Sequence, residues 1–462
     1  LSTWSIEDRT LLVNQCLELT CDSREAIRES YLSVMIYLPM ILGEEFRPLI
    51  DVTISSVIES ISHESDKVRN LAIKCIKIII KGFLRKDPSS LVGPLVEGVF
   101  SEKQVRRLSS IILLGDLLEI LNENEDNGEP LYETHSRIFT AMYIAKSDAN
   151  AEVRSAANNM FKIFVSAPQR CLRGILSELI TCYSIMLSKD SLHLNELALS
   201  SLEEFTTKYG EFFLGVLISQ VELLRGRTGI EGRKGLCIFL CYFIRFYPES
   251  CLTPEIKTKL FDELFDFFSY DEKQIWMQSL GGLRNIIEKS SDVSFLDEIL
   301  SNGFPDLKTI INDTLSYEKI TELFCCLLET RWPRLSSKII KILVVQEAKE
   351  WQLDVMLRKA DDIARLMYKT EGLESGADVL LSILFNVEKD NESLAKEAVL
   401  QILAATDLDI TSVIIEDLTR VVEKLTSDKD IGKLITIINL LSRYFEESVE
   451  ESVEEPVEEP VE

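Results

Sequence analysis

A recurring helical unit of about forty residues is the feature that most constrains what this chain can fold into. Four segments place an aliphatic residue and an arginine one turn into a helix and continue with apolar residues at helical spacing. They are AIRESYLSVMIYLP, KVRNLAIKCIKIII, QVRRLSSIILLGDLLEIL and AEVRSAANNMFKIFV. Three weaker copies follow, LHLNELALSSLEEF, EGRKGLCIFLCYFI and KQIWMQSLGGLRNII. The shared position recurs every 37 to 48 residues or so, at Arg28, Arg69, Arg106, Arg154, Asn195, Arg233 and Trp276.

This period is that of HEAT repeats, in which each unit is a helix, a short turn and a second helix. An amphipathic helix precedes the shared position in each unit, for example over 49–61 and 175–187. A helix pair cannot bury its apolar face alone, whereas stacked pairs share one continuous core. The sequence therefore predicts an all-α, HEAT/armadillo-type α-solenoid, a superhelix of antiparallel helix pairs. We expect about seven regular repeats over residues 1–290.

Two later regions depart from the regular pattern. Residues 291–445 keep helical periodicity but lose the aliphatic-arginine signature, which predicts divergent helical repeats. Residues 446–462, EESVEESVEEPVEEPVE, contain nine glutamates, and their charge and prolines predict a disordered tail or a motif for basic partners. An insertion at 122–130, NENEDNGEP, reads as an exposed acidic loop.

The composition limits the partners and compartments of the chain. With 50 Lys and Arg against 76 Asp and Glu, its formal net charge of -26 opposes phosphate backbones and anionic lipid. We expect no sequence-specific binding to nucleic acid and no membrane association, because the longest apolar run covers only 236–244. Ten scattered cysteines without a CxxC pair suggest reduced core thiols in a soluble cytosolic or nuclear protein. The chain begins at Leu1 without a signal-peptide pattern, so it could be a fragment.

No constellation in the sequence suggests catalysis. The three histidines, His63, His135 and His193, fall in different repeats, and none has the HExxH spacing of a zinc enzyme. A GxSxG elbow, a Walker loop and a dinucleotide fingerprint are also missing. We therefore expect no catalytic residue, metal site or cofactor, and a protein that is not an enzyme.

Two groups of basic residues are candidates for a functional role. The glycine-rich segment LLRGRTGIEGRKG places Arg225, Arg227, Arg233 and Lys234 around a single glutamate, and such a cluster can bind carboxylates or phosphates through the arginine fork. The alternative is a flexible turn between repeats in which Arg233 has a structural role. The second group, which we call the arginine ladder, recurs with the repeat and is expected to cap or bridge neighbouring units. It consists of Arg28, Arg69, Arg106 and Arg154.

The segments IRESYLSVMIYLPMILGEEFRPLI, VRNLAIKCIK, RRLSSIILLGDLLEIL and YIAKSDANAEVRSAANNMFKIFVSAPQRCLRGIL resemble one family, the translational activator called general control non-derepressible one. The resemblance covers 26–243. It implies a cytoplasmic scaffold that binds ribosomes and activates, under amino-acid starvation, the kinase of translation initiation factor two alpha. It also implies that 190–245 binds an RWD-type domain of that kinase. The family's Arg-x-Gly-x-Cys motif is kept as Arg233, Gly235 and Cys237, whereas an earlier basic motif is replaced by SLHLNELALSSLEEFTTKYGE.

A different class of HEAT adaptor is the alternative. Acidic charge suits a nuclear-transport receptor that holds basic cargo, or a scaffold of a phosphatase or another complex. The patterns expected for binding a small GTPase and nucleoporins are not recognisable here, which favours the translation scaffold.

Overall fold

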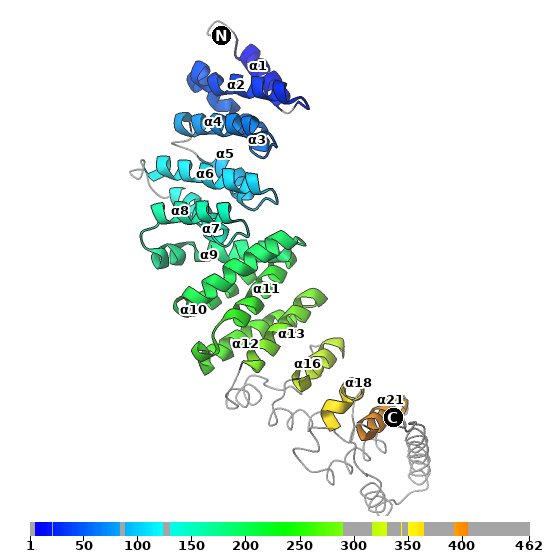
Figure 1. Ribbon diagram of the computed structural model, residues 1–462. Coiled ribbons are helices and arrows are strands. Elements are labelled where there is room, and N and C mark those ends of the chain that lie inside the picture. The colour runs from blue at the N-terminus through cyan, green and yellow to red at the C-terminus, as the bar shows by residue number, and fades with distance from the viewer. Residues whose placement is uncertain are drawn as a thin grey trace, which may run out of the picture. The chain divides into compact units, whose positions relative to one another are not determined.

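The computed structural model describes residues 5–20, 22–83, 88–122, 130–289, 317–329, 343, 350–364 and 392–404. In these ranges every regular element is a helix (Figure 1). The chain divides into two compact units, residues 1–252 and 253–462. The acidic insertion after Asn122, most of the divergent repeats and the whole glutamate-rich tail lie outside the described residues.

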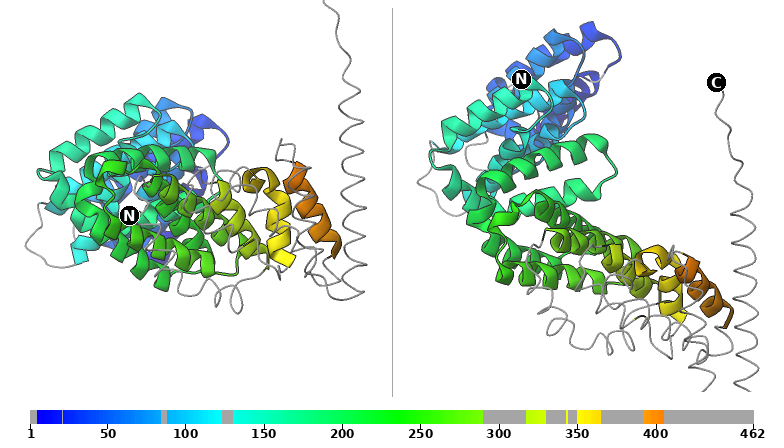
Figure 2. Two further views of the ribbon diagram at one scale, coloured as in Figure 1. Left: turned by 90° about the horizontal axis from the view of Figure 1, so that it is seen from below. Right: turned by 60° about the horizontal axis from the view of Figure 1, so that its bottom comes forward.

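The first unit is built from helix pairs that stack in two rows. Each pair packs internally, α1 with α2, α3 with α4, α5 with α6 and α7 with α8. The second helices, α2, α4, α6 and α8, form one row, and the first helices, α1, α3, α5, α7 and α9, form the other. The successive helices of this unit, coloured from blue to green, can be followed in Figure 1 and from two other sides in Figure 2. This is the predicted all-α, HEAT-type solenoid architecture. The elements are α1 (Ile6–Thr20), α2 (Glu25–Leu42), a 3-10 helix (Gly43–Leu49), α3 (Ile50–Ser60), α4 (Asp66–Phe83), α5 (Ser89–Val99), α6 (Gln104–Asn122), α7 (Pro130–Ala145), α8 (Ala151–Phe164), α9 (Pro168–Ser188), α10 (Leu192–Arg227), α11 (Ile230–Phe246) and a 3-10 turn (Glu249–Cys251).

The apolar residues of each helix recur at helical spacing, so they lie on the faces that contact neighbouring helices. In α4, Val68, Ala72, Cys75 and Ile79 recur every three to four residues and are fully buried. The thiol of Cys75 lies 3.7 Å from the carbonyl oxygen of Met35 on α2, so this face contacts the preceding repeat. The continuous core between repeats therefore follows directly from the helical period.

Helix α10 departs from the predicted arrangement of helix, turn and helix. It runs without a break for 36 residues, about 54 Å, and so joins two predicted helices. Phe205 and Phe213, on either side of Gly210, are buried with stacked rings 5.8 Å apart. The interior Gly210 costs only about 1 kcal/mol against alanine, too little to end a helix held by such packing. The ring of Tyr247 lies over Gly210, 3.0 Å from where a Cβ would stand.

The second unit contains shorter described helices that pack in chain order. Ser279 donates to the carbonyl of Leu264 between α12 and α13. Buried Lys319, on α16, donates to the carbonyl of Tyr270 at 2.7 Å and so satisfies the end of α12. The described helices are α12 (Pro254–Ser269), α13 (Lys273–Glu288), α16 (Tyr317–Glu329), α18 (Glu350–Arg358) and α21 (Glu392–Ala404).

One helix of the described residues, α9, is long and apolar enough to cross a membrane by length and composition. This corrects the expectation that the run 236–244 is the longest candidate. Half of the most apolar window of α9 is buried inside the protein, where α7, α10 and α11 pack on it. The core helix of a repeat array meets the same criteria, because it is apolar on several faces.

Candidate partner-binding surface

Three arginines of the predicted ladder hold the turn that leads into their own helix. Arg28, Arg69 and Arg154 are each the fourth residue of a helix. The guanidinium of Arg69 donates to the carbonyls of His63 and Glu64, both at 2.6 Å. Arg154 makes the equivalent bonds at 2.6 and 2.7 Å, and Arg28 donates to the carbonyl six residues before it. These hydrogen bonds satisfy carbonyls within one repeat.

In the third repeat the equivalent position is occupied by Arg107, one residue after the predicted Arg106. Helix α6 begins at Gln104, so Arg107 is its fourth residue. Its guanidinium donates to the carbonyls of Ser101 and Glu102 at 3.0 and 2.8 Å. The sequence contains two adjacent arginines here. The aliphatic-arginine pattern identifies Arg106 as the ladder residue, whereas counting from the first residue of the helix identifies Arg107. Arg107 also pairs with an aspartate of the next repeat.

The glycine-rich basic segment is mostly helical rather than a loop. Arg225 and Arg227 lie in the last turn of α10, and Arg233 and Lys234 lie in the first turn of α11. Only residues 228–229 separate the two helices. Cations at the end of α10 are favourable, because a helix C-terminus carries a partial negative charge. The structure therefore brings the four predicted basic residues to one tight helix–helix junction, where Arg227 is exposed and the other three are half-buried.

The motif Arg233, Gly235 and Cys237 packs α11 onto its neighbours. The Nε of Arg233 donates to the carbonyl of Arg225 at 3.4 Å, across the junction. A Cβ on Gly235 would stand 2.1 Å from the carbonyl oxygen of Ser184 on α9, so only glycine permits this approach. Cys237 is fully buried. Each motif residue thus has a structural role in this fold.

An exposed apolar stripe along the second half of α10 was not predicted from the sequence. The side chains of Phe212, Val216 and Leu223 are 59%, 45% and 42% exposed, and Arg227 continues the same helix face. Next to them, a Cβ on Gly215 would meet nothing within 4 Å. We call this stripe together with the four basic residues the α10–α11 surface. Its signal in the sequence is the helical spacing of Phe212, Val216 and Leu223.

The titratable groups of the described residues are mainly structural. Burial raises the pKa of the Cys75 thiol to about 12 and that of the Cys171 thiol to about 11, so both are protonated at neutral pH. His63 accepts a hydrogen bond from the backbone of Ser65 through Nδ1, at 3.1 Å. Within the described ranges, no three His, Cys, Asp or Glu residues are grouped so that they could hold a metal ion.

Comparisons with known proteins identify relatives. No family model matches the sequence. The eIF-2-alpha kinase activator GCN1 of Saccharomyces cerevisiae is 27% identical over 267 residues, which cover 52% of this chain and 10% of that protein. The human Stalled ribosome sensor GCN1 is 26% identical over 321 residues, covering 62% of this chain and 12% of that protein. The chain thus spans about a tenth of the length of these curated relatives.

Solved structures with a similar helical arrangement include Kap121p bound to RanGTP. It is 16% identical, with a TM-score of 0.43, and the match covers 95% of this chain and 49% of that one. The chain of stacked helix pairs is thus similar, over half or more of its length, to four GCN1 proteins at 26–27% identity.

Proposed function

We propose that the chain is a non-enzymatic scaffold of translational control, which binds ribosomes in the cytoplasm. The observation that supports this is the match over half of the chain to proteins named eIF-2-alpha kinase activator and stalled ribosome sensor. Stacked helix pairs suit the role, because each repeat adds exposed surface without requiring a closed active site.

Sedimentation of a cell lysate that contains the tagged chain tests this proposal. The chain should migrate with ribosomes in a sucrose gradient and move to the subunit fractions when chelation of Mg²⁺ separates the subunits. A chain that stays at the top of the gradient in both conditions would contradict ribosome binding.

We also propose that the α10–α11 surface binds the RWD-type domain of the kinase that phosphorylates translation initiation factor two alpha. Exposed apolar groups in a row mark protein-binding sites, and Phe212, Val216 and Leu223 form such a row. Arg227 at its end provides a planar fork for a carboxylate. The complementary partner face has an apolar centre and an acidic edge, and Arg225 and Lys234 add positive charge at the same junction.

Pull-down with the isolated kinase domain tests the surface. The double variant Phe212→Ser, Arg227→Glu should bind at least about tenfold more weakly, since it removes an apolar anchor and reverses a charge. Val52→Ser is the matched control, because Val52 on α3 is also half exposed, at 51%, but lies outside the surface. The melting temperatures of both variants should stay near that of the wild type. Equal binding by both variants would show that this surface is not used.

A further inference from the structure

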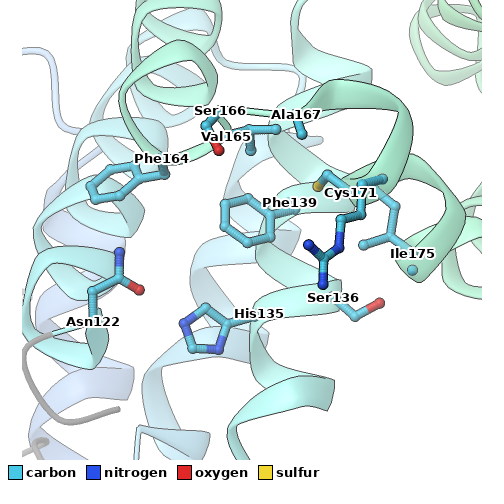
Figure 3. Close-up of a pocket in the computed structure, with 12 residues that line it drawn as sticks. Asn122, His135, Ser136, Phe139, Phe164, Val165, Ser166, Ala167, Cys171 and Ile175 are labelled. Carbon is cyan, nitrogen blue, oxygen red and sulfur yellow. The ribbon is translucent and has the colours of Figure 1, made fainter.

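A cavity of about 410 Å³ opens in the first unit, between α6, α7, α8 and α9. Its walls come from the end of α6, the middle of α7, the link after α8 and the first turns of α9. In Figure 3 the rings of His135, Phe139 and Phe164 and the amide of Asn122 surround one open space. The volume lies within the range of sites that hold a small ligand or a few side chains of a peptide.

The charge of this cavity differs from that of the chain. Among the described residues, its lining includes Arg170 and His135 and no aspartate or glutamate, although acidic residues outnumber basic ones in the chain by 76 to 50. The first turn of α9 also contains no acidic residue, and its N-cap, Ala167, offers no side-chain acceptor. Positive charge near a helix N-terminus opposes the helix dipole, so Arg170 does not serve the stability of α9.

The other walls are apolar. Val165 and Ile175 are buried, and Phe139 and Phe164 are half-buried with part of each ring open. The thiol of Cys171, whose pKa burial raises to about 11, is uncharged at neutral pH. A ligand that fits these walls combines one bulky apolar group with a negative charge.

We infer that this cavity binds an acidic peptide in which a bulky apolar side chain lies next to a carboxylate. The apolar side chain occupies the space between Phe139 and Phe164, and the carboxylate pairs with the guanidinium of Arg170. Nucleic acid fits less well, because binding of its backbone needs a track of several cations and the lining has one arginine. The site is separate from the α10–α11 surface and does not depend on the role proposed for that surface.

Fluorescence polarisation with defined probes tests the assignment. A labelled peptide GEEFLEEG should bind, whereas the uncharged GQQFLQQG, the truncated GEEAAEEG and a labelled ten-nucleotide polyuridine should each bind at least about tenfold more weakly. No binding of GEEFLEEG, or tighter binding of the polyuridine, would overturn the inference.

A matched pair of variants separates the cavity from general electrostatics. Arg170→Glu should reduce peptide affinity at least about tenfold, whereas Arg173→Glu, in the same helix turn but outside the lining, should change it less than about threefold. Both are exposed, and an acid near the N-terminus of α9 suits the helix dipole, so neither should lower the melting temperature. Equal loss of affinity in both variants would show long-range charge attraction instead of a site.

Discussion

Arg107 and Asp148, from neighbouring repeats, form a buried two-pronged ion pair. The Nε of Arg107 lies 2.7 Å from Oδ2 of Asp148, and its second terminal nitrogen lies 3.0 Å from Oδ1. The side chains are 6% and 0% exposed. Asp148 also accepts a hydrogen bond from the backbone of Asn150, at 2.8 Å, so the pair fixes the turn before α8.

Arg107→Ala should lower the free energy of unfolding by about 3 to 5 kcal/mol, because it leaves a buried carboxylate unpaired. Arg106→Ala should cost about 1 kcal/mol or less, because the half-buried Arg106 forms no ion pair with another described residue. Urea unfolding of the two variants distinguishes them. Similar losses would mean that Arg106 and Arg107 share the role that the structure gives to Arg107 alone.

Gly235→Ala should destabilise the protein by about 1 to 3 kcal/mol, because its methyl group would overlap the carbonyl of Ser184. Gly226→Ala, in the last turn of α10, is the control. A Cβ there meets nothing within 4 Å, so this change should be neutral or stabilise by up to about 1 kcal/mol. Thermal unfolding provides the comparison. Equal melting temperatures for the two variants would contradict the close approach of α11 to α9.

Stability should fall as the pH rises above about 9, partly through Cys75. Burial raises the pKa of its thiol from the ordinary 9.0 to about 12 in the folded protein. A raised pKa in the folded state gives stability that is fully present below the unfolded-state pKa and is lost as the pH rises through the folded-state value. The expected loss is about 1 kcal/mol from pH 9 to pH 10. Cys75→Ala should show a shallower loss over this interval, and identical pH slopes would contradict the buried thiol.

The position that recurs in each repeat is occupied by Arg69 in α4 and by Arg233 in α11, and alanine variants of the two residues test whether their roles differ. Arg69 bonds two carbonyls at 2.6 Å, so its loss should cost about 1 to 3 kcal/mol. The bond from Arg233 to the carbonyl of Arg225 is longer, at 3.4 Å, so the loss of this bond should cost less, about 1 kcal/mol. Binding of the kinase domain by folded Arg233→Ala should stay within about threefold of the wild type. A loss of binding with unchanged melting would instead place Arg233 in direct contact with the partner.

The repeat architecture could be predicted from the sequence because two kinds of residue recur in it with regular spacing. Apolar residues recur at helical spacing, and an arginine recurs at the fourth position of a helix in successive repeats. Both spacings follow from the local geometry of a helix and the turn before it, so they are visible in the sequence. The fusion of two helices into α10 was not accessible, because the packing of Phe205 on Phe213 overrides the usual meaning of an interior glycine.

The candidate sites were only partly accessible. The basic residues at the α10–α11 junction are visible as a cluster, but their helical setting and the exposure of Phe212 depend on how neighbouring helices pack. The pair of Arg107 and Asp148 joins residues 41 positions apart, and no local rule connects them. The cavity beside Arg170 likewise depends on four helices, α6 to α9, whose lining residues meet only in the folded chain.

The central proposal, that this chain binds ribosomes, is tested most directly with purified components. The chain is mixed with increasing amounts of purified eukaryotic ribosomes at physiological salt, and the ribosomes are pelleted. The account predicts saturable pelleting of the chain with ribosomes. The double variant Phe212→Ser, Arg227→Glu should pellet equally well, because the proposed kinase-binding surface is separate from the ribosome-binding one. A chain that remains in the supernatant at every ribosome concentration would contradict the account.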